Sequence, residues 1–190
     1  MSADWVTAIA TAGTFVVIAA SAAAALVQLR HMRGSNQIVA LTECRETLES
    51  PEFRAAQRFV SYELPRRLQD PDECRKAADL PFSDEYAAIG TVANFFESMG
   101  LFVKTGIIDR RIACDFWSFV VLRNWEALLP ITSYVRNKIG QPALWENFEY
   151  MAALSKRYQR DYASSYPAGM EHMPIDTSLI ERAKDWEHVG

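Results

Sequence analysis

The apolar residues of this chain are concentrated in one run near its beginning. From Trp5 to Leu29 the sequence has 25 residues without Asp, Glu, Lys or Arg. As a helix this run would be about 38 Å long, enough to cross a hydrocarbon core of ~30 Å with some tilt. A cleaved signal peptide is the alternative, but the residues before the run carry Asp4 and no Lys or Arg, whereas a signal peptide begins with a basic region. We therefore predict a transmembrane anchor and its basic flank in residues 1–33.

The residues on either side of the apolar run predict its orientation. Arg30 and Arg33 follow it directly, and Trp5 is placed to lie at the opposite membrane interface. Because cytoplasmic flanks carry the excess of Lys and Arg, we expect a single-pass protein of the cell (inner) membrane, with its N-terminus outside and its C-terminal domain in the cytoplasm. Small residues lie roughly on one helix face and would let a second helix approach, which makes a homo-oligomer one interpretation: Ala8, Ala12, Ala19 and Ala23.

After residue 33 the apolar positions recur at helical spacing, and no segment shows the alternation of a strand. Gly34-Ser35 is a candidate break, and residues 69–81, rich in Asp and Pro, predict a loop. The pattern predicts an all-α soluble domain, resembling a bundle of about five to six helices, over residues 34–164, with a loop and a short C-terminal helix over residues 165–190. Helix starts are predicted at Ser50-Pro51, Ser83, Asp109 and Pro142, and helix ends near Pro65, Gly106, Pro130 and Gly140.

The helix expected after Asp109 supplies the candidate functional site. Its apolar positions predict the face turned toward the core: Ile112, Phe116, Phe119, Val120 and Ala127. Arg123 falls on the same face, and a buried cation needs a partner, because breaking a buried ion pair costs roughly 3–5 kcal/mol. Glu97, which shares a helix face with Asn94, is the expected partner, and Arg136 would join them. These four residues form either an ion pair that ties helices together or a polar pocket for a small anion or a partner's charged group.

Composition and motif content argue against several classes of function. The net charge is −4, and about −5 once the charged residues of the anchor region are set aside, which is a poor match for nucleic acid. Cys44, Cys74 and Cys114 lie far apart and the three histidines are scattered, so we expect reduced thiols, no metal site and no cofactor. The sequence contains no nucleophile-elbow, phosphate-loop or zinc-protease motif, so no catalytic residue is assigned.

One stretch of the chain resembles a known family. The segment NFFESMGLFVKTGIID (residues 94–109), the Trp-containing helix after it, Arg136 and WENFEYMAAL (residues 145–154) together resemble the DUF4760 family. The resemblance extends over roughly Trp5 to Tyr158, and its most specific part is the Asn-Phe-Phe-Glu step with Gly106 and Asp109 downstream. It implies a mostly bacterial, membrane-anchored helical domain with no established activity, and it supplies no functional residues.

These observations favour a membrane-tethered helical interaction or regulatory module without catalytic activity. Its partners would be the lipid bilayer and a protein of unknown identity. Two alternative hypotheses belong to other functional classes. One is an oligomerising membrane effector whose small-residue helix perturbs the bilayer, and the other is an enzyme or small-anion binder with a polar pocket around Glu97 and Arg123.

Overall fold

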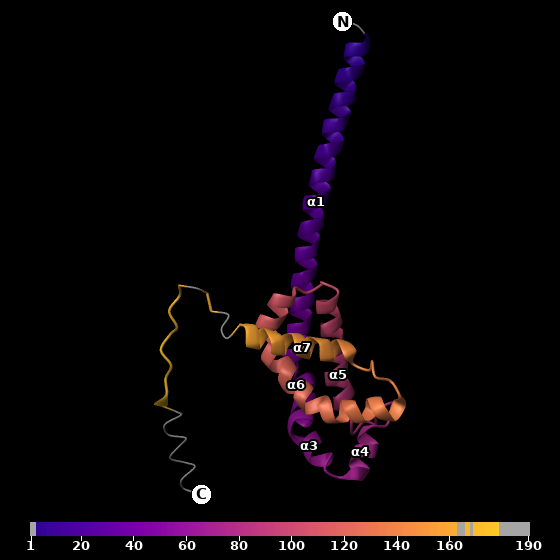
Figure 1. Ribbon diagram of the computed structural model, residues 1–190, viewed down its shortest axis with the longest axis vertical. Helices are drawn as coiled ribbons and strands as arrows, with labels where there is room; N and C mark the ends of the chain where they lie inside the picture. The colour runs from indigo at the N-terminus through magenta and orange to yellow at the C-terminus, as the bar shows by residue number, and fades with distance from the viewer. Residues whose placement is uncertain (1–2, 163–165, 168, 179–190) are drawn as a thin grey trace.

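The computed structural model describes residues 3–162, 166–167 and 169–178, and every regular element within them is a helix. The predicted all-α class is thus confirmed. A long helix rises from a smaller helical body, with α7 lying across α5 and α6 (Figure 1). The short C-terminal helix expected around Ile180 and Trp186 lies outside the described residues. The elements are α1 (Ala3–Glu49), α2 (Pro51–Arg58), the π-helix η1 (Phe59–Glu63), α3 (Leu64–Arg67), α4 (Pro71–Ala77), α5 (Ala87–Lys104), α6 (Arg110–Ile139) and α7 (Glu146–Asp161).

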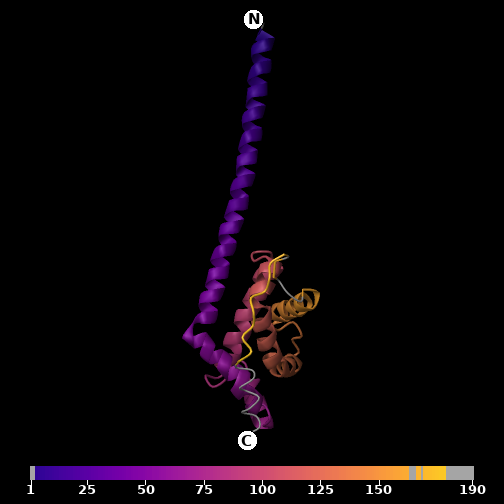
Figure 2. The ribbon, with the colours of Figure 1, turned by 90° about the vertical axis from the view of Figure 1, so that its left-hand side faces the viewer.

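Helix α1 is continuous over 47 residues (Figures 1 and 2). It is long and apolar enough to cross a membrane, and the large apolar side chains of its first part, such as Phe15 and Val16, are exposed. The break expected at Gly34-Ser35 is absent from this described helix, which passes through both residues. Near its end α1 buries Ala40 and Cys44 in the core of the body. The apolar part of α1 is therefore joined to the body by unbroken helix.

The segment after α1 begins as the sequence predicts and continues further. Ser50 caps α2, since its hydroxyl accepts a hydrogen bond from the Phe53 N–H at 3.1 Å. The helical path ends at Arg67, two residues past the predicted end near Pro65. Before that, the Leu64 N–H bonds to the Phe59 carbonyl, five residues back, and α3 follows through Pro65. Because Pro65 has no N–H and its ring crowds the carbonyl four residues back, the regular hydrogen-bond pattern is interrupted here. The loop expected over residues 69–81 contains α4, capped by Asp70.

Three further boundaries differ from the prediction. Helix α7 begins at Glu146, after a turn over residues 142–145, rather than at Pro142. Residues 84–86 form a turn, so α5 begins at Ala87 rather than just after Ser83. Helix α6 begins as predicted after Asp109, whose carboxylate accepts from two backbone N–H groups, but it does not end at Pro130. It contains Pro130, bends along its length, as Figure 1 shows, and continues to Ile139. Ile131, Thr132 and Val135, which follow the proline, are buried, so packing maintains the second half. Gly140, at a φ of 65°, ends α6 as predicted.

The face of α6 that points inward differs from the predicted one. Ile112, Phe116 and Phe119 were expected inside, yet their side chains are 41%, 68% and 69% exposed. The buried face is the adjacent one, turned by about one residue: Ala113, Cys114, Trp117, Val121, Asn124, Leu128, Ile131, Thr132 and Val135. An apolar stripe on α6 is therefore left at the surface.

The core is centred on aromatic contacts between α5, α6 and α7. Phe96 of α5 stacks on Phe148 of α7 with ring centroids 4.9 Å apart, and Trp125 of α6 meets the edge of Phe148 at 5.0 Å. Helices α5 and α7 approach so closely that a Cβ built on Gly100 would lie 2.0 Å from the Asn147 carbonyl oxygen. Only glycine fits at that crossing.

Candidate functional site

A groove of about 310 Å³ opens between the α2–η1 segment and the middle of α6. Three arginines line it, two from α2 and one from α6, together with exposed aromatic rings at Tyr62 and Phe119. The lining residues are Arg54, Gln57, Arg58, Ser61, Tyr62, Phe119, Val120, Arg123 and Asn124. Arg123 is thus the one predicted site residue that lies in this groove, and it lies there with partners that the sequence analysis did not name.

Local structure explains how the α2–η1 segment presents these groups. The Ser50 cap fixes the direction in which α2 leaves α1, and Phe53 and Ala56 bury the opposite side of α2. Arg54 and Arg58 are four residues apart and so share one helix face. The π-helical turn at η1 precedes Pro65, and Tyr62 within it reaches Arg123. Such turns widen a helix locally and are frequent at functional sites.

Arg123 is an exposed residue, which corrects the expectation that it is buried. Its Nη2 donates a hydrogen bond to the Tyr62 hydroxyl at 2.8 Å, and its guanidinium carbon lies 5.8 Å from the Tyr62 ring centre. No ion pair to Arg123, Arg54 or Arg58 occurs within the described part of the chain. The groove therefore holds three guanidinium groups without a bound carboxylate.

Asn124 lies against the same groove and is almost completely buried, with 3% of its surface exposed. Its Nδ2 donates to the Val120 carbonyl at 2.8 Å. Its Oδ1 has no hydrogen-bond partner among the described residues, which is uncommon for a buried polar atom and costs about 1–3 kcal/mol. The groove thus carries a concentrated positive charge, and the unpaired Oδ1 of Asn124 is buried behind its lining.

The other three predicted site residues meet elsewhere, around the start of α7. Asn94 accepts a hydrogen bond from Trp145 Nε1 at 2.9 Å, and the Glu97 carboxylate accepts from the Asn147 amide at 2.7 Å and the Phe148 N–H at 2.9 Å. Glu97 therefore bonds to the N-terminal turn of α7 in place of the expected Arg123.

Arg136 holds the other side of the same connection. It donates to the Leu144 carbonyl at 2.8 Å and pairs with Glu149 at 2.7 Å, and its guanidinium carbon lies 5.9 Å from the Trp125 ring centre. Asn94, Glu97 and Arg136 consequently fix α7 on the body from two sides, while Arg123 lies apart from them.

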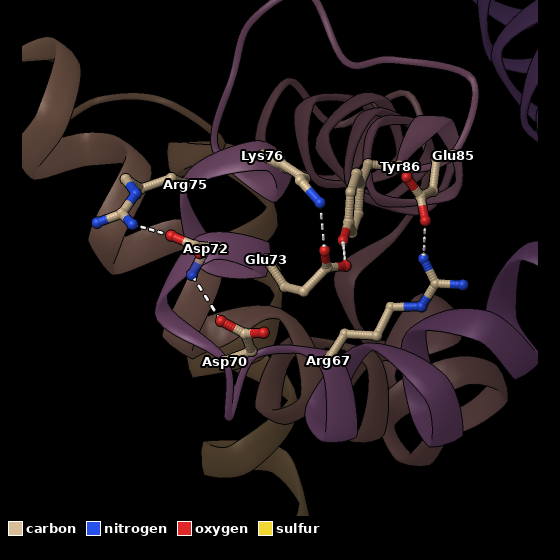
Figure 3. Close-up of polar contacts among 8 residues, drawn as sticks. All are labelled: Arg67, Asp70, Asp72, Glu73, Arg75, Lys76, Glu85 and Tyr86. Atoms are coloured by element: carbon tan, nitrogen blue, oxygen red, sulfur yellow. Dashed lines mark hydrogen bonds and ion pairs between the residues drawn. The ribbon is translucent and has the colours of Figure 1, made fainter.

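A separate polar cluster joins α3, α4 and the start of α5 (Figure 3). Glu73 accepts from Lys76 Nζ at 2.7 Å and from the hydroxyl of the buried Tyr86, and Arg67 pairs with Glu85. Burial raises the pKa of Tyr86, and the hydrogen bond from Lys76 lowers the pKa of Glu73, so a neutral phenol donates to an ionised carboxylate. These groups satisfy one another and connect three elements, which is a structural role.

Two of the three thiols, those of Cys44 and Cys114, are buried. Burial raises the pKa of both Cys44 and Cys114 to about 11, so both remain protonated near neutral pH and are weak nucleophiles. In the part of the chain that the structure describes, no three His, Cys, Asp or Glu side chains are grouped so as to hold a metal ion. The groove is therefore the described arrangement best suited to bind a ligand, and its three arginines suit an anion.

Sequence reasoning missed Arg54, Arg58 and Tyr62. The sequence held a signal for the first two: Arg54 and Arg58 are four residues apart, and like charges at that spacing on a helix repel each other. The contribution of Tyr62 depends on the π-helical turn, for which the sequence offers only the nearby Pro65.

Comparison with known proteins places most of the described chain in one family. The model of the family described as "Domain of unknown function (DUF4760)" matches residues 15–155, from within α1 to within α7. No curated protein and no solved structure matches the chain. Since the matched span covers well over half of the chain, this protein belongs to the DUF4760 family.

Proposed function

We propose that this protein is a single-pass, membrane-tethered recognition module that binds its target and does not catalyse a reaction. One observation carries the proposal. A single unbroken helix, α1, is exposed and apolar in its first part and contributes Ala40 and Cys44 to the core of the body in its last part. A helix of that kind both inserts in a bilayer and holds the domain rigidly beside it.

The flanks of the apolar run support a cytoplasmic location for the domain. Arg30 and Arg33 lie between the apolar run and the body, and Asp4 lies at the other end. By the positive-inside rule the body faces the cytoplasm at the inner membrane, and the N-terminus lies outside. Because α1 is unbroken, its end at Glu49 lies about 30 Å beyond the apolar run, from the 1.5 Å rise per helical residue after Leu29.

The small-residue stripe of α1 favours a single tether over an oligomerising effector. Ala19 and Cys44 are separated by about seven helical turns, and Ala12 and Cys44 by about nine, so the stripe faces the same side as the body. A parallel pair of α1 helices joined through this stripe would bring two bodies into the same space. We therefore expect the double variant Ala12→Leu/Ala19→Leu to have the same oligomeric state as the wild type, measured by light scattering in detergent. Loss of an oligomer in that variant would instead support the effector hypothesis.

Membrane extraction tests the tether directly. We expect the full chain to remain in the membrane pellet after alkaline carbonate treatment. The double variant Val17→Lys/Ile18→Asp places two charges inside the apolar run, each costing about 2.5–3.5 kcal/mol, and should shift the chain to the supernatant.

A matched control uses the same substitutions at Val39 and Ile38, which are exposed on α1 but lie beyond the apolar run. The control variant, Val39→Lys/Ile38→Asp, should stay in the pellet. A wild-type chain that appears in the supernatant would contradict the proposal.

A further inference from the structure

We propose that residues 177–190 form an amphipathic helix that docks, within the same chain, on the exposed apolar stripe of α6. The stripe consists of Ile112, Phe116 and Phe119, all of which are exposed. This inference goes beyond a membrane tether, because it concerns a surface of the helical body and the part of the chain that covers it.

The stripe gathers three large apolar side chains on one surface of the body. Ile112, Phe116 and Phe119 are separated by four and three residues, so they share one face of α6. Contiguous apolar surface is typical of an interaction site, whereas apolar residues exposed singly need no explanation. A groove of about 170 Å³ adjoins the stripe and adds concave apolar surface to it. The residues that line this groove are Leu41, Thr42, Arg45, Phe116 and Trp117.

Other helices border the stripe on both sides. On one side, the Tyr158 hydroxyl of α7 donates a hydrogen bond to Asp115 Oδ1 of α6 at 3.1 Å. On the other side, Phe116 lines the adjoining groove together with Leu41 of α1. Figure 2 shows α1 and α7 on either side of α6. An apolar face bordered in this way suits an amphipathic helix laid along it.

The last residues of the chain carry a matching apolar pattern. Leu179, Ala183 and Trp186 are separated by four and three residues, the same spacing as in the α6 stripe. In a helix they would share one face, and Glu181 and Asp185 would lie on the other side. The segment therefore has the apolar face that the stripe lacks a partner for, and a charged face for water.

The described residues include the start of this helix. Ser178 has a helical conformation, and Asp176 Oδ1 accepts a hydrogen bond from its N–H at 2.9 Å, as an N-cap does. The same hydrogen bond lowers the pKa of Asp176, so the cap is ionised near neutral pH. A helix over residues 177–190 would be about 20 Å long, enough to cover the roughly 10 Å of α6 between Ile112 and Phe119.

The chain leaves α7 beside the stripe, which favours docking within one chain. The guanidinium carbon of Arg111, the neighbour of Ile112, lies 5.8 Å from the ring centre of Tyr162 at the end of α7. Residues 163–176 then span at most about 50 Å, and Figure 1 shows residues 169–178 on the side of the body where α6 lies. A connection this short gives the segment an effective concentration on the order of millimolar, above that of a second copy.

The bilayer is a less suitable partner for the stripe. Leu41 lines a groove with Phe116, so the two residues lie at the same level of the molecule. Leu41 is about 18 Å along α1 from Leu29, the end of the apolar run. The headgroup layer extends only roughly 5–8 Å beyond the hydrocarbon core, so the stripe lies outside it. This step rests on the proposed tether, which membrane extraction tests separately.

Docking at this place also affects the arginine groove. Phe119 belongs both to the stripe and to the lining of the groove between α2 and α6. A helix on the stripe therefore lies at the edge of that groove. A target that uses both surfaces has to displace the segment.

Hydrogen–deuterium exchange with mass spectrometry tests the docking, on the full chain in phosphatidylcholine nanodiscs. An isolated helix of this length is marginally stable in water, so slow exchange of residues 179–190 requires docking. We expect their backbone N–H groups to exchange at least roughly tenfold more slowly in the wild type than in the Trp186→Ser variant. The Phe116→Ser/Phe119→Ser variant, changed only on α6, should lose the same protection.

Two matched controls separate docking from other effects of substitution. Glu181→Ser changes the face of the segment opposite to its apolar residues, and Tyr134→Ser removes an exposed ring of α6 beyond Pro130. Residues 179–190 should exchange in both controls as they do in the wild type. Because Phe116 and Phe119 are exposed and Trp186 lies outside the body, both test variants should keep the cooperative thermal transition of the body. Lost protection then cannot be assigned to misfolding.

Three results would overturn the proposal. The first is equally fast exchange of residues 179–190 in the wild type and in Trp186→Ser. The second is protection that survives in Phe116→Ser/Phe119→Ser, which would place the segment on another surface, such as the bilayer. The third is protection that falls when the nanodiscs are diluted, which would assign the docking to a second copy of the chain.

Discussion

Replacing Glu97 by Ala removes the carboxylate that connects α5 to the start of α7. That carboxylate accepts hydrogen bonds from the Phe148 N–H at 2.9 Å and from the Asn147 side chain at 2.7 Å. Phe148 lies in the first turn of α7, where N–H groups lack intrahelical partners and the helix dipole favours negative charge. A hydrogen bond to a charged group contributes about 1.5–3 kcal/mol, and Glu97 is half-buried, so the lower value applies to each bond. We expect a loss of about 3 kcal/mol.

For a chain of this size that loss lowers the melting temperature by roughly 6–12 °C. The assay is thermal unfolding of the full chain in detergent, followed by near-ultraviolet circular dichroism, because a membrane helix would keep its far-ultraviolet signal. The Glu97→Gln variant keeps one acceptor, and its melting temperature should fall between those of the Glu97→Ala variant and the wild type.

The matched control is Glu126→Ala, which removes a carboxylate of α6 that has no side-chain bond among the described residues. It should change the stability by less than about 0.5 kcal/mol. If the Glu97→Ala and Glu126→Ala variants have the same melting temperature, Glu97 does not stabilise the fold, and its predicted role in binding is favoured instead.

Gly100→Ala should destabilise the body by about 1–3 kcal/mol, because its Cβ would lie 2.0 Å from the Asn147 carbonyl; equilibrium denaturation measures this. Gly34→Ala meets nothing within 4 Å and should raise the melting temperature through an increase of about 1 kcal/mol in helix stability; an unchanged or lower melting temperature would contradict the unbroken helix. Burial raises the pKa of Cys44 and Cys114 from 9.0 to about 11, so folding favours the neutral thiols: their contribution to stability is complete below pH 9 and is lost as the pH rises toward 11. Denaturation at several pH values should show this loss, and it should diminish in the Cys44→Ala/Cys114→Ala variant.

Helix boundaries that depend on neighbouring residues could be predicted from the sequence. Ser50 and Asp109 accept from backbone N–H groups two or three residues on, and Gly140 adopts a positive φ, so each signal acts within its own turn. The predicted helix end at Pro130 and the predicted helix start at Ser83 were wrong, because contacts beyond the local sequence determine both boundaries. The buried residues after Pro130 hold α6 together, and the turn over residues 84–86 delays α5.

The face of α6 could not be predicted, because this helix carries two neighbouring apolar stripes. Phe116 and Phe119 mark one, and Trp117 and Val121 mark the other. Periodicity gives their spacing but does not tell which stripe meets the rest of the fold. That decision depends on the approach of α7 and η1, which lie far away in the sequence.

Only part of the candidate site could be predicted, because the site also depends on contacts between segments far apart in the sequence. Arg123 was recognisable as a cation within an apolar pattern, but its neighbours in space come from α2 and η1. Asn94 and Glu97 share a helix face, as expected from their spacing, yet the partners that they bond belong to the start of α7.

The most direct test of the tethered module is its topology. Two reporters would be fused separately to the C-terminus of the full chain, one active only in the cytoplasm and one active only outside. We predict cytoplasmic activity in the membrane fraction, and a shift toward the outside reporter when Arg30 and Arg33 are both replaced by Glu. Activity of the outside reporter in the wild type would contradict the orientation, and release of a shorter soluble product would contradict the anchor itself.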